Sequence, residues 1–133
     1  MPLDGKPFLG QPRFADLNRF VEPIKSGETV ISYHDAQPFT RFMGSIASDQ
    51  PLEVTFAFAN DEVGPDGNYV TDETISKLHY DAEALRQIYD PNKQGSTGKY
   101  FVTIFGRWLR VEVKNTGANP TEKLRVFVRG SVF

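Results

Sequence analysis

The chain has few residues able to do acid–base or metal chemistry, and its two histidines come first among them. His34, followed by Asp35, could join His79 as metal ligands or as an acid–base pair, because imidazole binds divalent metals and titrates near neutral pH. The two histidines belong to separate candidate strands, and the chain contains no cysteine that could complete a metal site. We therefore expect surface or hydrogen-bonded histidines, no bound metal and no catalytic residue.

An acidic segment is the second candidate for chemistry. Residues 61–73 include two glycines and five carboxylates, namely Asp61, Glu62, Asp66, Asp72 and Glu73. Hard cations such as calcium take oxygen ligands, but the segment lacks the D-x-D-x-D-G spacing of an EF-hand loop. The sequence Asp66-Gly67-Asn68 favours instead a solvated turn in which a residue adopts positive φ. We expect no cofactor here.

Other catalytic signatures are missing from the sequence. It contains neither a Gly-x-Ser-x-Gly nucleophile motif nor a Walker-type phosphate loop. A carboxylate pair for glycoside hydrolysis stays an open alternative, because the separation of such a pair depends on the fold. Trp108 falls opposite the apolar positions of its strand, so it is either an exposed sugar platform or interface anchor, or is covered by a second sheet or a loop. We expect that the chain is not an enzyme.

The composition is that of one globular domain. A length of 133 residues suffices for a single core, and an aromatic content of 13% with eleven phenylalanines favours a packed β fold. The net charge of −2, with scattered basic residues, gives no electrostatic indication of a nucleic-acid or membrane partner. The sequence begins without a signal-peptide pattern, so we expect synthesis in a cytoplasm.

Alternating apolar residues predict β-strands along most of the chain. The segment from Gly106 to Phe133 has two such runs on either side of Asn, Gly and Pro turn residues, and it predicts one antiparallel hairpin with Val111 and Val126 buried. Further strands are expected at Leu52–Ala59 and Tyr100–Phe105, and from weaker patterns at Thr29–Tyr33, Arg41–Ala47 and Ile75–Tyr80. Leu85, Ile88 and Tyr89 have helical spacing, which indicates a helix over Ala82–Tyr89.

Strands at intervals with turn signals between them predict an all-β fold, a single antiparallel β-sandwich of jelly-roll type. We expect this sandwich domain to span residues 28–133, after an extended N-terminal arm at residues 1–27. Four prolines in the arm disfavour regular pairing, and apolar side chains lie between them. Because such side chains need cover, the arm is expected to lie on another surface. Two alternatives are an arm that wraps its own domain and a short helix over Arg13–Val21.

Three short patterns carry a resemblance to a known group of proteins. They are Ser48-Asp49-Gln50 before the strand Leu52–Ala59, then Asp66-Gly67-Asn68-Tyr69, and the run from Gly106 to Gly117. The most specific part is the Arg-aromatic-x-Arg-Val-x-Val-x-Asn run from Arg107 to Asn115. With the apolar strand that follows, the pattern covers roughly Ser48 to Phe133, and it resembles the small β-sandwich decoration (cement) proteins and head-fibre or knob domains of tailed bacteriophages.

The resemblance implies a structural virion protein on the capsid surface. Its partners would be the major capsid protein and further copies of itself, often in a homotrimer, and it would be made in the host cytoplasm. The candidate interface residues are Phe8, Phe14, Phe20, Trp108 and Arg110. Alternatives are a phage tail or head-fibre component, or a carbohydrate-binding module that uses Trp108, Tyr69 or Tyr100. The segment Thr74–Lys99 and the arm depart from the pattern, which leaves open the oligomeric state and the surface that faces the shell.

Overall fold

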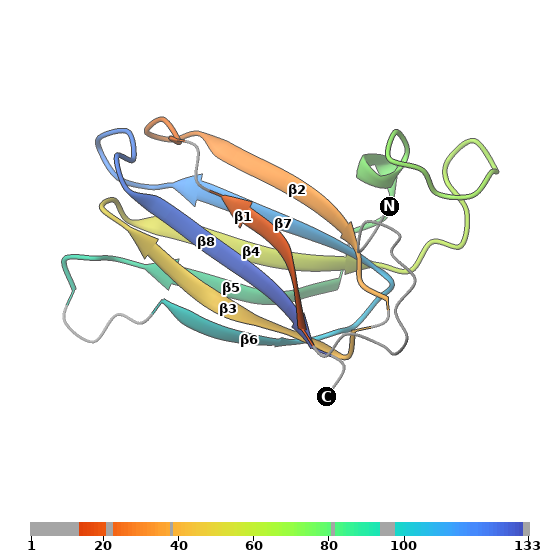
Figure 1. The fold of residues 1–133 in the computed structure, drawn as a ribbon. Coiled ribbons are helices and arrows are strands. Elements are labelled where there is room, and N and C mark those ends of the chain that lie inside the picture. The colour runs from red at the N-terminus through yellow and green to blue at the C-terminus, as the bar shows by residue number, and fades with distance from the viewer. Residues whose placement is uncertain (1–13, 21–22, 38, 81, 94–97, 132–133) are drawn as a thin grey trace.

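The computed structural model is a sandwich of two four-stranded antiparallel sheets (Figure 1), and it describes residues 14–20, 23–37, 39–80, 82–93 and 98–131. The strands are β1 (Phe14–Phe20), β2 (Thr29–Asp35), β3 (Arg41–Ser48), β4 (Leu52–Ala59), β5 (Ala82–Tyr89), β6 (Lys99–Thr103), β7 (Trp108–Asn115) and β8 (Leu124–Ser131). A short 3-10 helix, η2 (Ile75–Lys77), lies between β4 and β5. Among the described residues, no helix has the length and hydropathy needed to cross a membrane.

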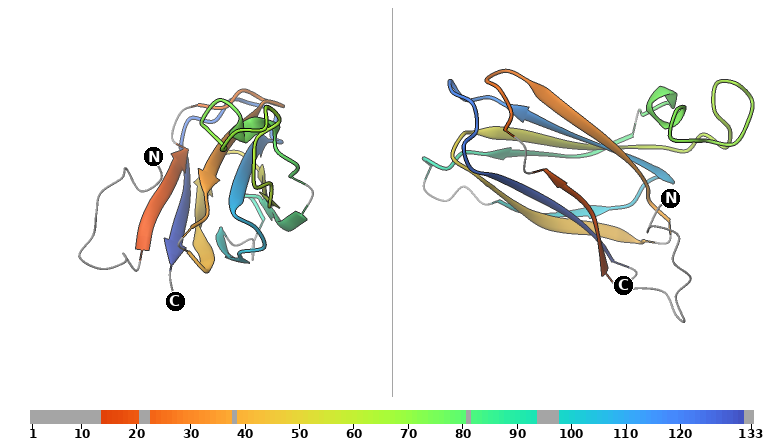
Figure 2. Two further views of the ribbon diagram at one scale, coloured as in Figure 1. Left: turned by 90° about the vertical axis from the view of Figure 1, so that its right-hand side faces the viewer. Right: turned by 45° about the horizontal axis from the view of Figure 1, so that its top comes forward.

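The order of the strands is that of a jelly roll. Sheet A has the order β1-β8-β3-β6 and sheet B has the order β2-β7-β4-β5, so that most consecutive strands lie in opposite sheets (Figure 2). All paired neighbours are antiparallel. Eight strands in two sheets, connected in this interleaved way, form the two Greek keys of a jelly roll. The predicted all-β, jelly-roll-like sandwich is confirmed.

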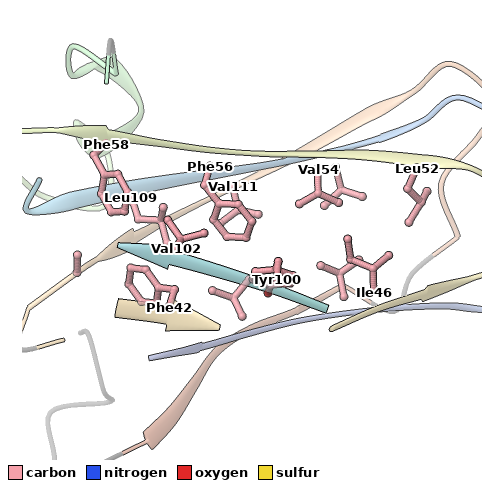
Figure 3. Close-up of a cluster of buried hydrophobic side chains, with 14 of the residues drawn as sticks. Phe42, Ile46, Leu52, Val54, Phe56, Phe58, Tyr100, Val102, Leu109 and Val111 are labelled. Atoms are coloured by element: carbon pink, nitrogen blue, oxygen red, sulfur yellow. The ribbon is translucent and has the colours of Figure 1, made fainter. Parts of the chain in front are cut away.

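The core lies between the two sheets (Figure 3). It consists of the side chains that point inward at alternate positions along the strands. Rings from the two sheets meet there: Phe42 stacks on Phe58 with 6.3 Å between ring centroids, and Phe56 lies 5.0 Å from Tyr100. Burying one such large apolar side chain stabilises the fold by about 1.5–3 kcal/mol. Val111 and Val126 are both fully buried, as their alternation predicts.

The predicted hairpin of β7 and β8 is wrong, because these two strands belong to different sheets. β7 pairs with β2 and β4, whereas β8 pairs with β1 and β3. The alternation of a half-buried strand identifies its inward face but not its neighbour. A two-residue turn would have enforced a hairpin, whereas the longer connection from Thr116 to Lys123 allows the chain to cross between sheets.

The predicted helix over Ala82–Tyr89 is also wrong, since this segment forms β5 beside β4. Leu85 and Tyr89 both pack against the core. Residues four apart share a face in a helix and in a strand alike, so this spacing does not distinguish the two. Ile88 decides the matter, because it points away from the core and is largely exposed.

The predicted strand over Ile75–Tyr80 is replaced by the 3-10 helix η2. Its backbone groups form local hydrogen bonds. The amides of Thr74 and Ile75 both donate to the carbonyl oxygen of Thr71, and the amide of Lys77 donates to the carbonyl oxygen of Thr74. These hydrogen bonds between neighbours in the sequence use the groups that a sheet ladder would need. The segment therefore belongs to the connection between β4 and β5.

Part of the predicted arm belongs to the sandwich. Residues Phe14–Phe20 form β1, an edge strand of sheet A that pairs with β8 from Phe14↔Ser131 to Phe20↔Val126. The alternative of a short helix is therefore wrong for these residues. Ile24, also within the predicted arm, is a buried core residue. Residues Phe14–Phe20 and Ile24 thus lie on their own domain, in agreement with the alternative of an arm that wraps that domain.

Candidate interaction surfaces

His34 lies on the face of β2 that also carries the core-packed Val30, and its Nε2 is 2.9 Å from Ser32 Oγ. Desolvation by burial lowers the pKa of His34 to about 4, so the imidazole is neutral at pH 7. Asp35 does not join it: its carboxylate is 3.5 Å from the guanidinium of Arg107. His34 and Asp35 therefore have separate partners.

Ser32, which contacts His34, is a residue that the sequence does not single out. A hydroxyl within hydrogen-bond distance of an imidazole is the arrangement of a nucleophile and its base. The pair lies on the inner side of the sandwich, where His34 is in register with the fully buried Leu109. Both side chains are part-buried, and an imidazole whose pKa is lowered to about 4 is a weak base, which favours a structural hydrogen bond.

The burial of His34 predicts a loss of stability in mild acid. The imidazole of the unfolded chain has a pKa near 6.5, whereas that of the folded chain is about 4. Because the pKa of His34 is lower in the folded chain, protonation of the imidazole favours the unfolded chain. The contribution of neutral His34 to the free energy of unfolding is therefore fully present above pH 6.5 and declines as the pH falls toward 4. Between pH 7 and 4.5 this group should remove about 2.5 kcal/mol, as an upper value, from the free energy of unfolding.

Urea unfolding at pH 7 and pH 4.5 measures this loss. The variant His34→Gln should lose less stability than wild type over that interval, by up to the amount above. The control variant Asn119→Ala, at an exposed position that does not titrate, should lose as much as wild type does. Equal losses in wild type and His34→Gln would show that the acid sensitivity has another source.

His79 lies in the connection between β4 and β5 and binds Asp61. Its Nδ1 is 2.7 Å from Asp61 Oδ2, and its backbone amide donates to Asp61 Oδ1 at 3.1 Å. Desolvation raises the pKa of Asp61, but the hydrogen bonds and charge of His79 outweigh it and leave the pKa below its usual value. His79 thus contacts Asp61, whereas His34 contacts Ser32 and Asp35 contacts Arg107, so these contacts do not join the three residues into the metal or acid–base group considered from the sequence.

The acidic segment forms the expected turn. Gly67 has a φ of 82°, and Asp66 Oδ1 accepts a hydrogen bond from the amide of Asn68. The amide of Gly64 donates to the carbonyl oxygen of Asn68 and closes the turn. Within the part of the chain that the structure describes, no group of three or more His, Cys, Asp or Glu side chains could hold a metal ion.

Trp108 is covered by the connection between β4 and β5, which is the second of the two alternatives for this residue. It is 7% exposed and packs with Ala59 and Leu78. Its indole Nε1 donates to the carbonyl oxygen of Asp61 at 3.0 Å. A ring held in this way cannot stack on a sugar.

Arg110 is half-buried under the same connection. Its guanidinium lies 5.2 Å from the centroid of the Tyr80 ring, and its Nε is 3.3 Å from Glu112. Tyr80 in turn packs on Tyr33, with 5.5 Å between ring centroids. Arg110 thus helps to hold the connection on the outer side of sheet B.

The three aromatic residues proposed for sugar binding do not form one platform. Trp108 and Tyr100 are buried, whereas Tyr69 is 87% exposed. Tyr100 belongs to the core cluster between the sheets, and Trp108 belongs to the separate cluster under the connection between β4 and β5. Only Tyr69 could contact a ligand without a rearrangement of the fold.

The outer side of sheet A carries a second set of aromatic residues. Phe101 is 56% exposed, with the guanidinium of Arg41 at 5.5 Å from its ring centroid. Arg125 lies 5.1 Å from the ring centroid of Phe127 in the same way. The sequence does not predict this surface, because Tyr100–Phe105 is a nearly continuous apolar run. The alternation between exposed and buried residues along β6 is evident only in the structure.

The remaining interface candidates lie in the N-terminal part of the chain. Phe8 is outside the described residues, and Phe14 and Phe20 are the first and last residues of β1.

Comparison of the sequence with models of protein families and with curated proteins finds no match. The function must therefore be inferred from the fold and its surfaces.

Proposed function

We propose that this chain is a structural virion protein, a decoration (cement) protein that binds the major capsid protein on the outside of a phage head. The observation that carries the proposal is the jelly-roll strand order, with β1-β8-β3-β6 facing β2-β7-β4-β5. Jelly rolls of this kind build viral capsid domains, lectins and cupins. The resemblance of Ser48–Phe133 to phage decoration proteins points to the first of these three classes.

A fold alone does not decide between a capsid protein and a lectin. The aromatic side chains favour the capsid protein, because two of the three residues that a sugar-binding module could use, Trp108 and Tyr100, are buried. The exposed aromatic Phe101 lies beside Arg41 on a broad sheet face. Arginine and aromatic residues are enriched in contacts between proteins. This surface therefore suits assembly better than binding of a small ligand.

Shells assembled with and without the protein test the proposal. Shells without it should form, but they should release DNA at a lower temperature and after milder osmotic shock, because several copies bound across subunit junctions add their contacts through effective concentration. Adding the purified chain back should restore the release temperature.

Equal heat resistance of the two kinds of shell, together with no binding of the added chain, would contradict the proposal. Binding of the purified chain to a glycan array would instead support the carbohydrate-binding alternative. Binding to purified tails but not to heads would support the tail-fibre alternative. A control shell from an unrelated phage should bind none of the chain.

A further inference from the structure

Two surfaces of the molecule have opposite charge. We define the basic face as the outward positions Arg41, Lys99, Phe101, Arg125, Phe127 and Arg129 of β3, β6 and β8. These three strands contain four cationic side chains and no aspartate or glutamate. The cations point outward because the residues beside them in the chain, such as Phe42, Tyr100 and Val126, are buried in the core.

Aromatic rings give the basic face an apolar component. Arg41 lies over the ring of Phe101 and Arg125 over that of Phe127. An arginine stacked on a ring keeps its charge while its planar group covers apolar surface. Phe101 nevertheless remains more than half exposed. The face is thus suited to a partner with both carboxylates and apolar side chains.

The connection between β4 and β5 has this composition. We define the acidic loop as residues 60–73, which contain five carboxylates and no lysine or arginine. Val63 and Tyr69 in the same loop are exposed, at 47% and 87%. The turn at Asp66 and Gly67 fixes the shape of the loop, which projects from one end of the sandwich (Figures 1 and 2).

The acidic loop cannot reach the basic face of its own chain. The connection that contains it packs on Trp108 and Ala59, which point outward from sheet B. The basic face is the outer side of sheet A, so the whole sandwich separates the two. Only a second molecule can bring these surfaces together.

We propose that the basic face binds the acidic loop of a second copy of this chain. Two different surfaces then meet at each contact, so the association is head-to-tail, and it forms a ring where the rotation closes or a chain of copies where it does not. Exposed charges dominate the contact, so salt should weaken it. The proposal stands independently of the proposed function, since it concerns the isolated chain.

A charge-swap experiment tests the contact. The face variant carries Lys99→Glu and Arg125→Glu, and the loop variant carries Glu62→Lys and Asp72→Lys; all four side chains are exposed. Arg129 is left unchanged because it is in register with Asp16 of β1. A control variant, Lys114→Glu, changes the same kind of charge on sheet B.

Sedimentation velocity in 50 mM and 500 mM NaCl measures association. Wild type and the control should associate in low salt, with at least tenfold weaker association in high salt. The face variant and the loop variant alone should each associate at least tenfold more weakly than wild type. An equimolar mixture of the two should regain association as a 1:1 complex, because the unchanged basic face of the loop variant then meets the unchanged acidic loop of the face variant. Circular dichroism should show that all variants remain folded.

Two results would overturn the proposal. One is a wild-type chain that stays monomeric at 100 µM in low salt, and the other is a mixture that fails to regain association. A single-stranded oligonucleotide is the probe for a competing occupant, since stacked arginine and aromatic side chains also suit nucleic acid. Binding of dT20 by wild type and the loop variant but not by the face variant, with no self-association, would assign the face to nucleic acid instead.

Discussion

Replacing Val111 by aspartate is expected to unfold the domain, with a loss of about 5 kcal/mol or more in the free energy of unfolding. Val111 is fully buried in the central strand β7, where it is in register with Ser32 of β2 and Phe56 of β4. A carboxylate at this position would lie among apolar side chains, and either its charge or its protonation would cost free energy. A single domain has only about 5–15 kcal/mol of stability to lose.

Far-UV circular dichroism at 25 °C and urea unfolding measure this effect. The matched control is Ala47→Asp, because Ala47 is exposed on β3 and is in register with Arg125. The control should change the free energy of unfolding by less than about 0.5 kcal/mol, the usual range for surface substitutions. A Val111→Asp protein as stable as wild type would mean that the inward register of β7 is wrong.

The second large effect is expected at Asn115, where alanine should cost about 4 kcal/mol of stability. The side chain is fully buried and makes three hydrogen bonds: Nδ2 donates to the carbonyl oxygens of Ile24 and Asn119, and Oδ1 accepts from the amide of Gly117. Alanine would leave these backbone groups without this partner. Unpaired buried polar groups are costly because water no longer solvates them.

The variant Asn119→Ala is the control for Asn115→Ala. Asn119 is exposed, and its contact with Asn115 uses only its backbone carbonyl oxygen. Urea unfolding of this variant should differ from wild type by no more than about 0.5 kcal/mol. A loss of similar size in both variants would indicate that the loop conformation, and not the amide of Asn115, sets the stability.

The alternation of apolar residues predicts the strands of this fold well but not their neighbours. It identifies Leu52–Ala59 to the residue and the buried faces of β7 and β8. It does not reveal that β7 and β8 lie in different sheets, because a side-chain pattern records burial and not the partner of a strand. The strand β5 escapes prediction for a related reason, since its pairing with β4 outweighs a pattern that suits helix and strand equally.

The candidate surfaces depend still more on contacts between distant residues. Trp108 is covered by a connection that begins with Asn60, almost fifty residues earlier in the chain. The pairing of His79 with Asp61, 18 residues apart in one connection, and that of Arg41 on β3 with Phe101 on β6 likewise join residues distant in the sequence. By contrast, the turn at Asp66 and Gly67 is predicted correctly, because a local sequence determines it.

The position of β8 has a consequence for synthesis of the protein. β8 is the last strand that the structure describes, yet it lies inside sheet A between β1 and β3, and it is the only described strand that pairs with β1. Sheet A therefore cannot form completely until β8 has left the ribosome. Pairing between strands so far apart in sequence is slow. Nascent chains that lack β8 would expose the edge of β3 and the inner side of sheet B, and they would be open to aggregation until β8 has been made.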